Sequence, residues 1–172
     1  REGDEEAGRA TTNYPLPITH YQPKIQNSLL PLVEADGLLT DRPLQAVWVA
    51  SADCTPVLIA DRHTGQVAAV HAGWRGTAMK IVPQAIARLQ ARGSQIHDLR
   101  LALGPAIAGS VYQVSQQVAA EVGASIIATE AAKILALLAE IPNSPLLPDS
   151  HPERVRLDIR RVIALQLEQL GI

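Results

Sequence analysis

Cysteine is nearly absent from this chain of 172 residues, and its single cysteine, Cys54, excludes an internal disulfide. A strong charge of either sign is also missing. The formal charge is −2 at pH 7 and the basic residues are scattered, which argues against nucleic acid or an anionic membrane as a partner. No apolar run approaches the roughly 20 residues that span a bilayer, so no transmembrane segment is predicted. The N-terminus is acidic and lacks the basic start of a secretion signal, which predicts a cytoplasmic protein.

The composition that remains is that of an ordinary globular domain. Hydrophobic residues make up 47% of the chain, and the length suits one domain with a real core. Internal repeats and low-complexity tracts are not found. Residues 1–34 hold several prolines and no sustained period, so they are predicted to form an irregular N-terminal arm. The regular elements are expected in residues 35–172.

Three apolar segments rich in strand-forming residues are predicted to belong to one sheet: residues 46–50, 56–60 and 66–71. A five-residue connection that ends in Gly65 joins the second segment to the third, and this predicts an antiparallel hairpin. In such a hairpin Cys54 precedes the first strand and His71 ends the second strand.

A helix is predicted over residues 78–92, where Val82, Ile86 and Leu89 follow the spacing of one buried helical face and Gly93 provides a stop. Residues 99–103 are predicted as a further strand.

Three more helices follow in the chain. Ser115 and Asp158 are predicted N-caps of two of them, and the apolar spacing over residues 134–141 predicts the other. The irregular alternation of strands and helices favours a single layered domain of the α/β or α+β class.

Cys54 and His71 are the first candidates for a functional site. Catalytic zinc usually has three protein ligands drawn from His, Cys and carboxylate side chains, and these two residues would supply two of them. The same pair would also serve as nucleophile and base in a cysteine hydrolase without metal. A lone cysteine or a lone strand-end histidine is commonly structural, so the prediction depends on the pair.

Arg75 lies four residues after His71, between two glycines, where its planar guanidinium would hold an oxyanion through two hydrogen bonds. Asp53 is interpreted either as a turn residue or as a group that orients a ligand. The turn at residues 104–107 either ends a strand or offers backbone N–H groups to an anion. Three further histidines are expected to be exposed in polar loops: His63, His97 and His151.

Several segments together resemble the YfiH-like family, whose members are also called laccase-domain or polyphenol oxidase proteins and, more recently, purine nucleoside phosphorylases. The match covers residues 35–123 strongly and continues more weakly to residue 172. The segments that carry it are Ala35-Asp36-Gly37-Leu38-Leu39-Thr40-Asp41-Arg42-Pro43, Ala52-Asp53-Cys54-Thr55-Pro56-Val57-Leu58, His71-Ala72-Gly73-Trp74-Arg75-Gly76, and Gly104-Pro105-Ala106-Ile107 with Tyr112.

The resemblance implies a layered α/β (α+β) sandwich, a fold shared with a group of cysteine hydrolases. It implies that residues 35–172 form the central part of a single YfiH-like domain, without the family's segments at both ends. It also implies a zinc ion held by two histidines and one cysteine, with Cys54 and His71 in two of these places. The family's other histidine lies in a Gln-Val-His-Gly-like motif that this sequence lacks, so His20 or a histidine outside this chain is expected to be the third ligand.

The activity implied by the resemblance is a zinc-dependent transferase reaction, the cleavage of adenosine, inosine or guanosine by phosphate, with hydrolytic deamination of adenosine as a second activity. Cys54, His71 and Asp53 would be catalytic and Arg75 would bind phosphate. The alternatives are a metal-free cysteine hydrolase that uses Cys54 and His71, a copper polyphenol oxidase, and a non-catalytic binding protein. Copper is disfavoured because five histidines, one cysteine and no His-x-His pair are too few ligands for a multicopper enzyme.

Overall fold

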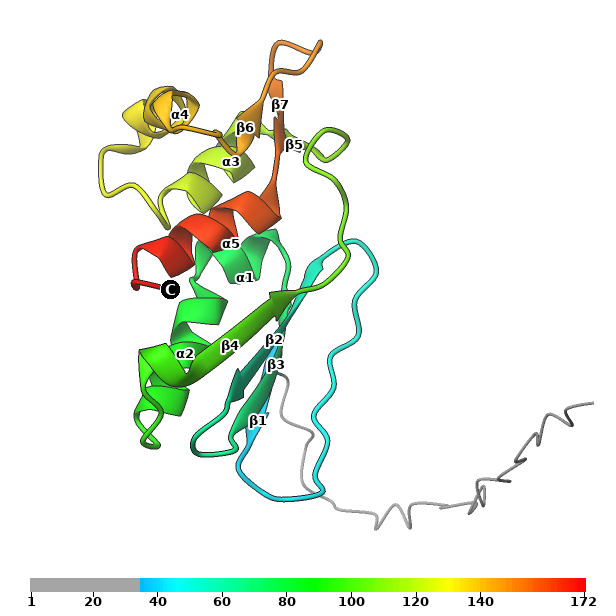
Figure 1. The fold of residues 1–172 in the computed structure, drawn as a ribbon. Helices are drawn as coiled ribbons and strands as arrows, with labels where there is room; N and C mark the ends of the chain where they lie inside the picture. Colours follow the sequence, from blue (N-terminus) through cyan, green and yellow to red (C-terminus); the bar gives the residue numbers. More distant parts are fainter. Residues whose placement is uncertain (1–34) are drawn as a thin grey trace, which may run out of the picture. The chain divides into compact units, whose positions relative to one another are not determined.

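A computed structural model describes residues 35–172, which form two antiparallel sheets with helices packed against them (Figure 1). The first sheet has the strand order β1-β3-β2-β4 and the second has the order β5-β7-β6. The strands are β1 (Gly37–Thr40), β2 (Thr55–Asp61), β3 (Val67–Ala72), β4 (Leu99–Leu103), β5 (Gln113–Ser115), β6 (Leu146–Leu147) and β7 (Arg154–Leu157). The predicted mixed α/β class is therefore confirmed.

The predicted hairpin is confirmed as strands β2 and β3. Thr55 lies opposite Ala72 and Pro56 lies opposite His71, so the start of β2 and the end of β3 meet at one end of the sheet. At the other end, Gly65 has a φ of 76°, which a glycine adopts without steric cost. This register brings the segments that contain Cys54 and His71 to the same end of the hairpin.

Two of the helices begin at the predicted caps, Ser115 and Asp158. The Ser115 hydroxyl accepts a hydrogen bond from the Val118 N–H at 3.2 Å, and the Asp158 carboxylate accepts one from the Arg161 N–H at 3.1 Å. Within residues 35–172, no helix combines the length and apolarity needed to cross a membrane. The helices are α1 (Trp74–Ala78), α2 (Ile81–Gln90), a 3-10 turn η1 (Ile96–Asp98), α3 (Gln116–Gly123), α4 (Ala131–Glu140) and α5 (Ile159–Glu168).

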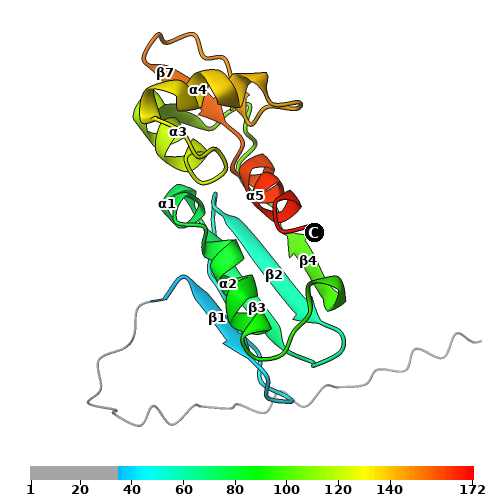
Figure 2. The ribbon, with the colours of Figure 1, turned by 90° about the vertical axis from the view of Figure 1, so that its left-hand side faces the viewer.

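Helix α2 covers one face of the first sheet (Figure 2). Its predicted apolar face is confirmed, because Val82, Ile86 and Leu89 are at most 1% exposed. Pro83 lies in the first turn, where a missing N–H costs no helical hydrogen bond. The core that includes these side chains continues through β2 and β3 to α3 and α5.

The strand predicted at residues 46–50 is wrong. This segment belongs to no strand, and Trp48 is 78% exposed. Strand β1 occupies the sheet edge beside β3, where Gly37 lies opposite Val70. Residues 46–50 therefore lie outside the sheet despite their strand-forming composition, because a strand needs a neighbouring strand to pair with as well as a high propensity.

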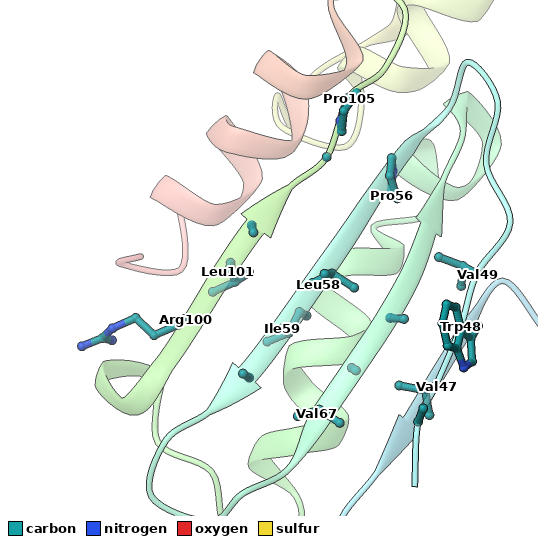
Figure 3. A pocket seen from close by; sticks show the side chains of 16 residues that line it. Val47, Trp48, Val49, Pro56, Leu58, Ile59, Val67, Arg100, Leu101 and Pro105 are labelled. Carbon is teal, nitrogen blue, oxygen red and sulfur yellow. The ribbon is translucent and has the colours of Figure 1, made fainter. Parts of the chain in front are cut away.

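The face of the first sheet opposite α2 is open and apolar. A hollow of about 830 Å³ lies on it, with Leu58 and Trp48 among its lining side chains (Figure 3). Arg100 lies at one end of the hollow, and Pro56 and Pro105 lie at the other. Cys54, His71 and Arg75 do not line it, so the hollow is distinct from the candidate site.

Asp61 ties the β2–β3 turn together, because its Oδ1 accepts hydrogen bonds from the His63 N–H at 2.7 Å and the Thr64 N–H at 2.9 Å. The Ser94 hydroxyl, the Thr64 N–H and the His63 N–H hold the pKa of Asp61 well below its usual value near 3.9. The ionised form is therefore favoured in the folded protein, and its stabilising effect is complete above about pH 4 and is lost as the pH falls through the lowered pKa.

We expect Asp61→Asn to flatten the acid limb of the stability profile, because the amide keeps a hydrogen-bond oxygen and removes the titrating proton. The measurement is urea denaturation of both proteins from pH 7 to pH 2. If the unfolding free energies of the unaltered protein and of Asp61→Asn differed by the same amount at every pH in that range, Asp61 would not contribute to the pH dependence of stability.

Candidate active site

Cys54 and His71 meet where the β2–β3 hairpin leads into α1. Cys54 directly precedes β2 and is partly buried, and His71 lies one residue before the end of β3 with a side chain that is 30% exposed. A Cβ atom placed on Gly73 would lie 3.0 Å from Cys54 Sγ and 3.7 Å from His71 Cε1. The thiol and the imidazole therefore lie against the same glycine, and a larger residue at position 73 would push into them.

Arg75 is the second residue of α1 and follows Gly73 by two positions. Its guanidinium carbon lies 4.4 Å above the centre of the Trp74 ring, which is a cation–π contact. Trp74 is itself packed against the core, whereas Arg75 is exposed. The indole thus provides a fixed surface for a guanidinium that remains accessible to an anion.

Tyr112 borders the same region from the loop after β4. Burial raises the pKa of the Tyr112 phenol, the negative charge of the Cys54 thiolate raises it further, and the Arg75 guanidinium lowers it. The phenol therefore lies within electrostatic reach of both residues. Tyr112 is itself half-buried and packs against the core.

Backbone hydrogen bonds clamp the turn at residues 104–107 against the start of β2. The Gly104 N–H donates to the Pro56 carbonyl at 2.8 Å, and the Ile107 N–H donates to the Asp53 carbonyl at 2.9 Å. Pro105 has no N–H group. Two of the amides that an anion would need are therefore already used, and the turn acts as a support for the Cys54 segment.

Asp36 contacts His71, which sequence reasoning did not anticipate. Its carboxylate Oδ1 lies 3.2 Å from His71 Nδ1, and its carbonyl oxygen accepts a 2.7 Å hydrogen bond from the His71 N–H. Asp36 belongs to a segment that carries the family resemblance. It lies 35 positions before His71, and nothing in the sequence pattern indicated that the two residues are in contact. Asp53, the predicted carboxylate, is exposed, and its role remains a prediction.

Two side chains of the kinds that bind zinc lie together in the described residues. A thiolate and an imidazole are ordinary zinc donors, and Cys54 and His71 converge as such a pair. Among residues 35–172, no group of three or more His, Cys, Asp or Glu side chains is placed to hold a metal ion. His20, one candidate for the third ligand, lies outside the described residues. The other three histidines are exposed, as predicted.

Comparison with known families gives a match over most of the chain. Residues 13–172 match the family described as "Multi-copper polyphenol oxidoreductase laccase". A purine nucleoside phosphorylase of Synechocystis is 56% identical over 144 residues, which cover 80% of this chain and 53% of that protein. A purine nucleoside phosphorylase of Mycobacterium tuberculosis is 36% identical over 141 residues, which cover 82% of this chain and 50% of that protein.

Solved structures agree with these sequence matches. YlmD from Geobacillus stearothermophilus has a TM-score of 0.63 and 29% identity, and the match covers 80% of this chain and 47% of that one. The hypothetical protein YfiH from Bacillus licheniformis has a TM-score of 0.61 and 28% identity over the same shares of the two chains. The chain thus spans about half the length of the relatives that it matches.

Proposed function

Since the chain belongs to the YfiH-like family of laccase-domain proteins, we propose that it cleaves purine nucleosides with phosphate and that Cys54 and His71 hold a zinc ion for this reaction. A phosphate oxygen bonds to C1′ of the ribose while the bond from C1′ to N9 breaks. The base leaves with that electron pair and takes a proton, and the other product is ribose 1-phosphate. Adenosine, inosine and guanosine are the proposed substrates.

The convergence of Cys54 and His71 on Gly73, with Arg75 two residues further along the chain, carries the proposal. Arg75 binds the phosphate, because a guanidinium offers two parallel N–H donors to an oxyanion. The stacking of Arg75 on Trp74 limits the orientations of the guanidinium and helps place the nucleophile. The Tyr112 phenol, whose pKa burial raises further above neutral pH, donates a hydrogen bond to phosphate or to a ribose hydroxyl.

Zinc, when bound, would act as a Lewis acid and add positive charge at the place where charge develops on the substrate. Cys54 and His71 are two of its ligands, and the third is His20 or a histidine outside this chain. Asp53 is proposed to support the site as a proton relay from the exposed segment that precedes Cys54. Deamination of adenosine is proposed as a second activity of the same site, in which water adds at C6 and ammonia leaves.

The proposal is tested by incubating the purified, unchelated full-length protein with inosine, adenosine or guanosine, with and without phosphate. We expect about one zinc per chain by elemental analysis and phosphate-dependent release of base with an equal amount of ribose 1-phosphate. The Synechocystis relative, assayed in parallel, is the positive control. Base release that needs no phosphate would overturn phosphorolysis, and ammonia release from adenosine reports the second activity.

A cysteine hydrolase without metal is the competing function, because the same geometry places His71 next to the Cys54 thiol. Cys54 is the only cysteine in the chain, so alkylation by iodoacetamide reports on this residue alone. Modification that becomes rapid only after chelation supports metal ligation. Rapid modification at equal rates with and without a chelator supports a free nucleophile, and absence of both zinc and turnover supports a non-catalytic protein.

A further inference from the structure

Asp36 holds His71 at two points, one on the backbone and one on the side chain. The backbone contact continues the β1–β3 ladder, in which Gly37 pairs with Val70. The ladder register therefore places residue 36 beside residue 71 whatever its side chain is. The second contact, 3.2 Å between Asp36 Oδ1 and His71 Nδ1, depends on the aspartate.

This second contact determines which ring nitrogen of His71 is available. A carboxylate oxygen accepts hydrogen bonds, so Nδ1 must carry the proton in a neutral ring that makes this contact. The proton-free lone pair is then on Nε2. The Cε1 atom, which joins the two nitrogens, faces Gly73, against which Cys54 Sγ also packs. Nε2 is bonded to this Cε1 atom.

The exposure of the pair argues against a mainly stabilising role. The Asp36 side chain is 62% exposed and that of His71 is 30% exposed, and an ion pair of this exposure contributes little to folding. A weaker interaction is enough to orient a metal ligand than to stabilise the fold, because one hydrogen bond selects a tautomer and restricts rotation of the ring.

We propose that Asp36 is a positioning residue that holds His71 in the Nδ1–H tautomer and so presents Nε2 to the bound metal or to the proton that is transferred. The use of Nε2 rests on the proposed function, whereas the tautomer does not. Asp36 thus takes the orienting role that sequence reasoning considered for Asp53.

The direct test is 15N NMR of the histidine side chains in the metal-free chain at a pH where His71 is neutral. The His71 signals are assigned with His71→Gln. We expect the Nδ1–H tautomer in the unaltered chain, the same tautomer in Asp36→Asn, which keeps the acceptor oxygen, and a shift towards Nε2–H in Asp36→Ala. Asp41→Ala removes an exposed carboxylate that follows the other end of β1, and it should leave the tautomer unchanged.

Zinc affinity gives a second measurement. Loss of an orienting carboxylate typically weakens metal binding about 10- to 100-fold, so we expect a loss of that order in Asp36→Ala, a smaller loss in Asp36→Asn and none in Asp41→Ala. The melting temperature should change little in all three. An Nε2–H tautomer in the unaltered chain, or a tautomer that Asp36→Ala leaves unchanged, would overturn the inference. A chain that shows the tautomer dependence but no phosphorolysis would refute the proposed function alone.

Discussion

Replacement of His71 or Cys54 by alanine is expected to lower nucleoside phosphorolysis on the order of 100-fold or more. Each change removes a proposed zinc ligand, and a catalytic metal supplies several kcal/mol of transition-state stabilisation. Each loss of about 1.36 kcal/mol of that stabilisation lowers the rate tenfold. Zinc content should fall in parallel. The measurement is kcat/KM for inosine at saturating phosphate, together with metal analysis of each variant and its circular dichroism spectrum to confirm folding.

His63→Ala is the matched control. His63 is exposed in the turn at the opposite end of the same hairpin, so the variant loses an imidazole without altering the candidate site. It should keep both zinc and activity. Two folded variants, Cys54→Ala and His71→Ala, that both retained full phosphorolysis would show that the site lies elsewhere in the protein.

Replacement of Ile59 by alanine is expected to cost about 2–5 kcal/mol of unfolding free energy, because it removes a buried side chain and leaves a cavity. Ile59 is 1% exposed in the middle of β2 and belongs to the core that also contains the buried face of α2. Its neighbour Leu58 points to the open face and is 58% exposed. Leu58→Ala should therefore cost less than about 1 kcal/mol.

Urea denaturation at one pH measures the unfolding free energy of both variants. If that free energy falls with urea concentration at the same slope in both, the variants differ in stability alone. The pair is closely matched, since the two residues are adjacent on one strand and each loses aliphatic carbons. If Leu58→Ala cost as much as Ile59→Ala, the open face would be covered by protein in solution. That result would contradict the exposure of the hollow lined by Leu58 and Trp48.

Local sequence signals predicted the elements whose structure depends on near neighbours. The β2–β3 hairpin was predicted from two apolar segments and a short turn with Gly65. The N-caps Ser115 and Asp158 were predicted because their side chains accept hydrogen bonds from free N–H groups in the first turn of a helix. The apolar face of α2 followed from its spacing. The placement of Cys54 near His71 belongs to the same group, because the hairpin register alone brings them to one end.

Other elements depend on partners that are distant in the chain. Residues 46–50 have the composition of a strand, but the edge beside β3 is taken by β1, so they remain outside the sheet. The second sheet, β5-β7-β6, consists of strands of two to four residues, too short for a periodic pattern to indicate.

Side-chain patterns within about twenty residues were enough to predict the hairpin, the caps, the buried helix face and the proximity of Cys54 to His71. Three features became evident in the three-dimensional fold alone: the sheet order, the contact of Asp36 with His71 and the stacking of Arg75 on Trp74. These contacts depend on which distant segments or which side-chain conformations have the lowest free energy in the whole fold, and a local pattern does not encode that competition.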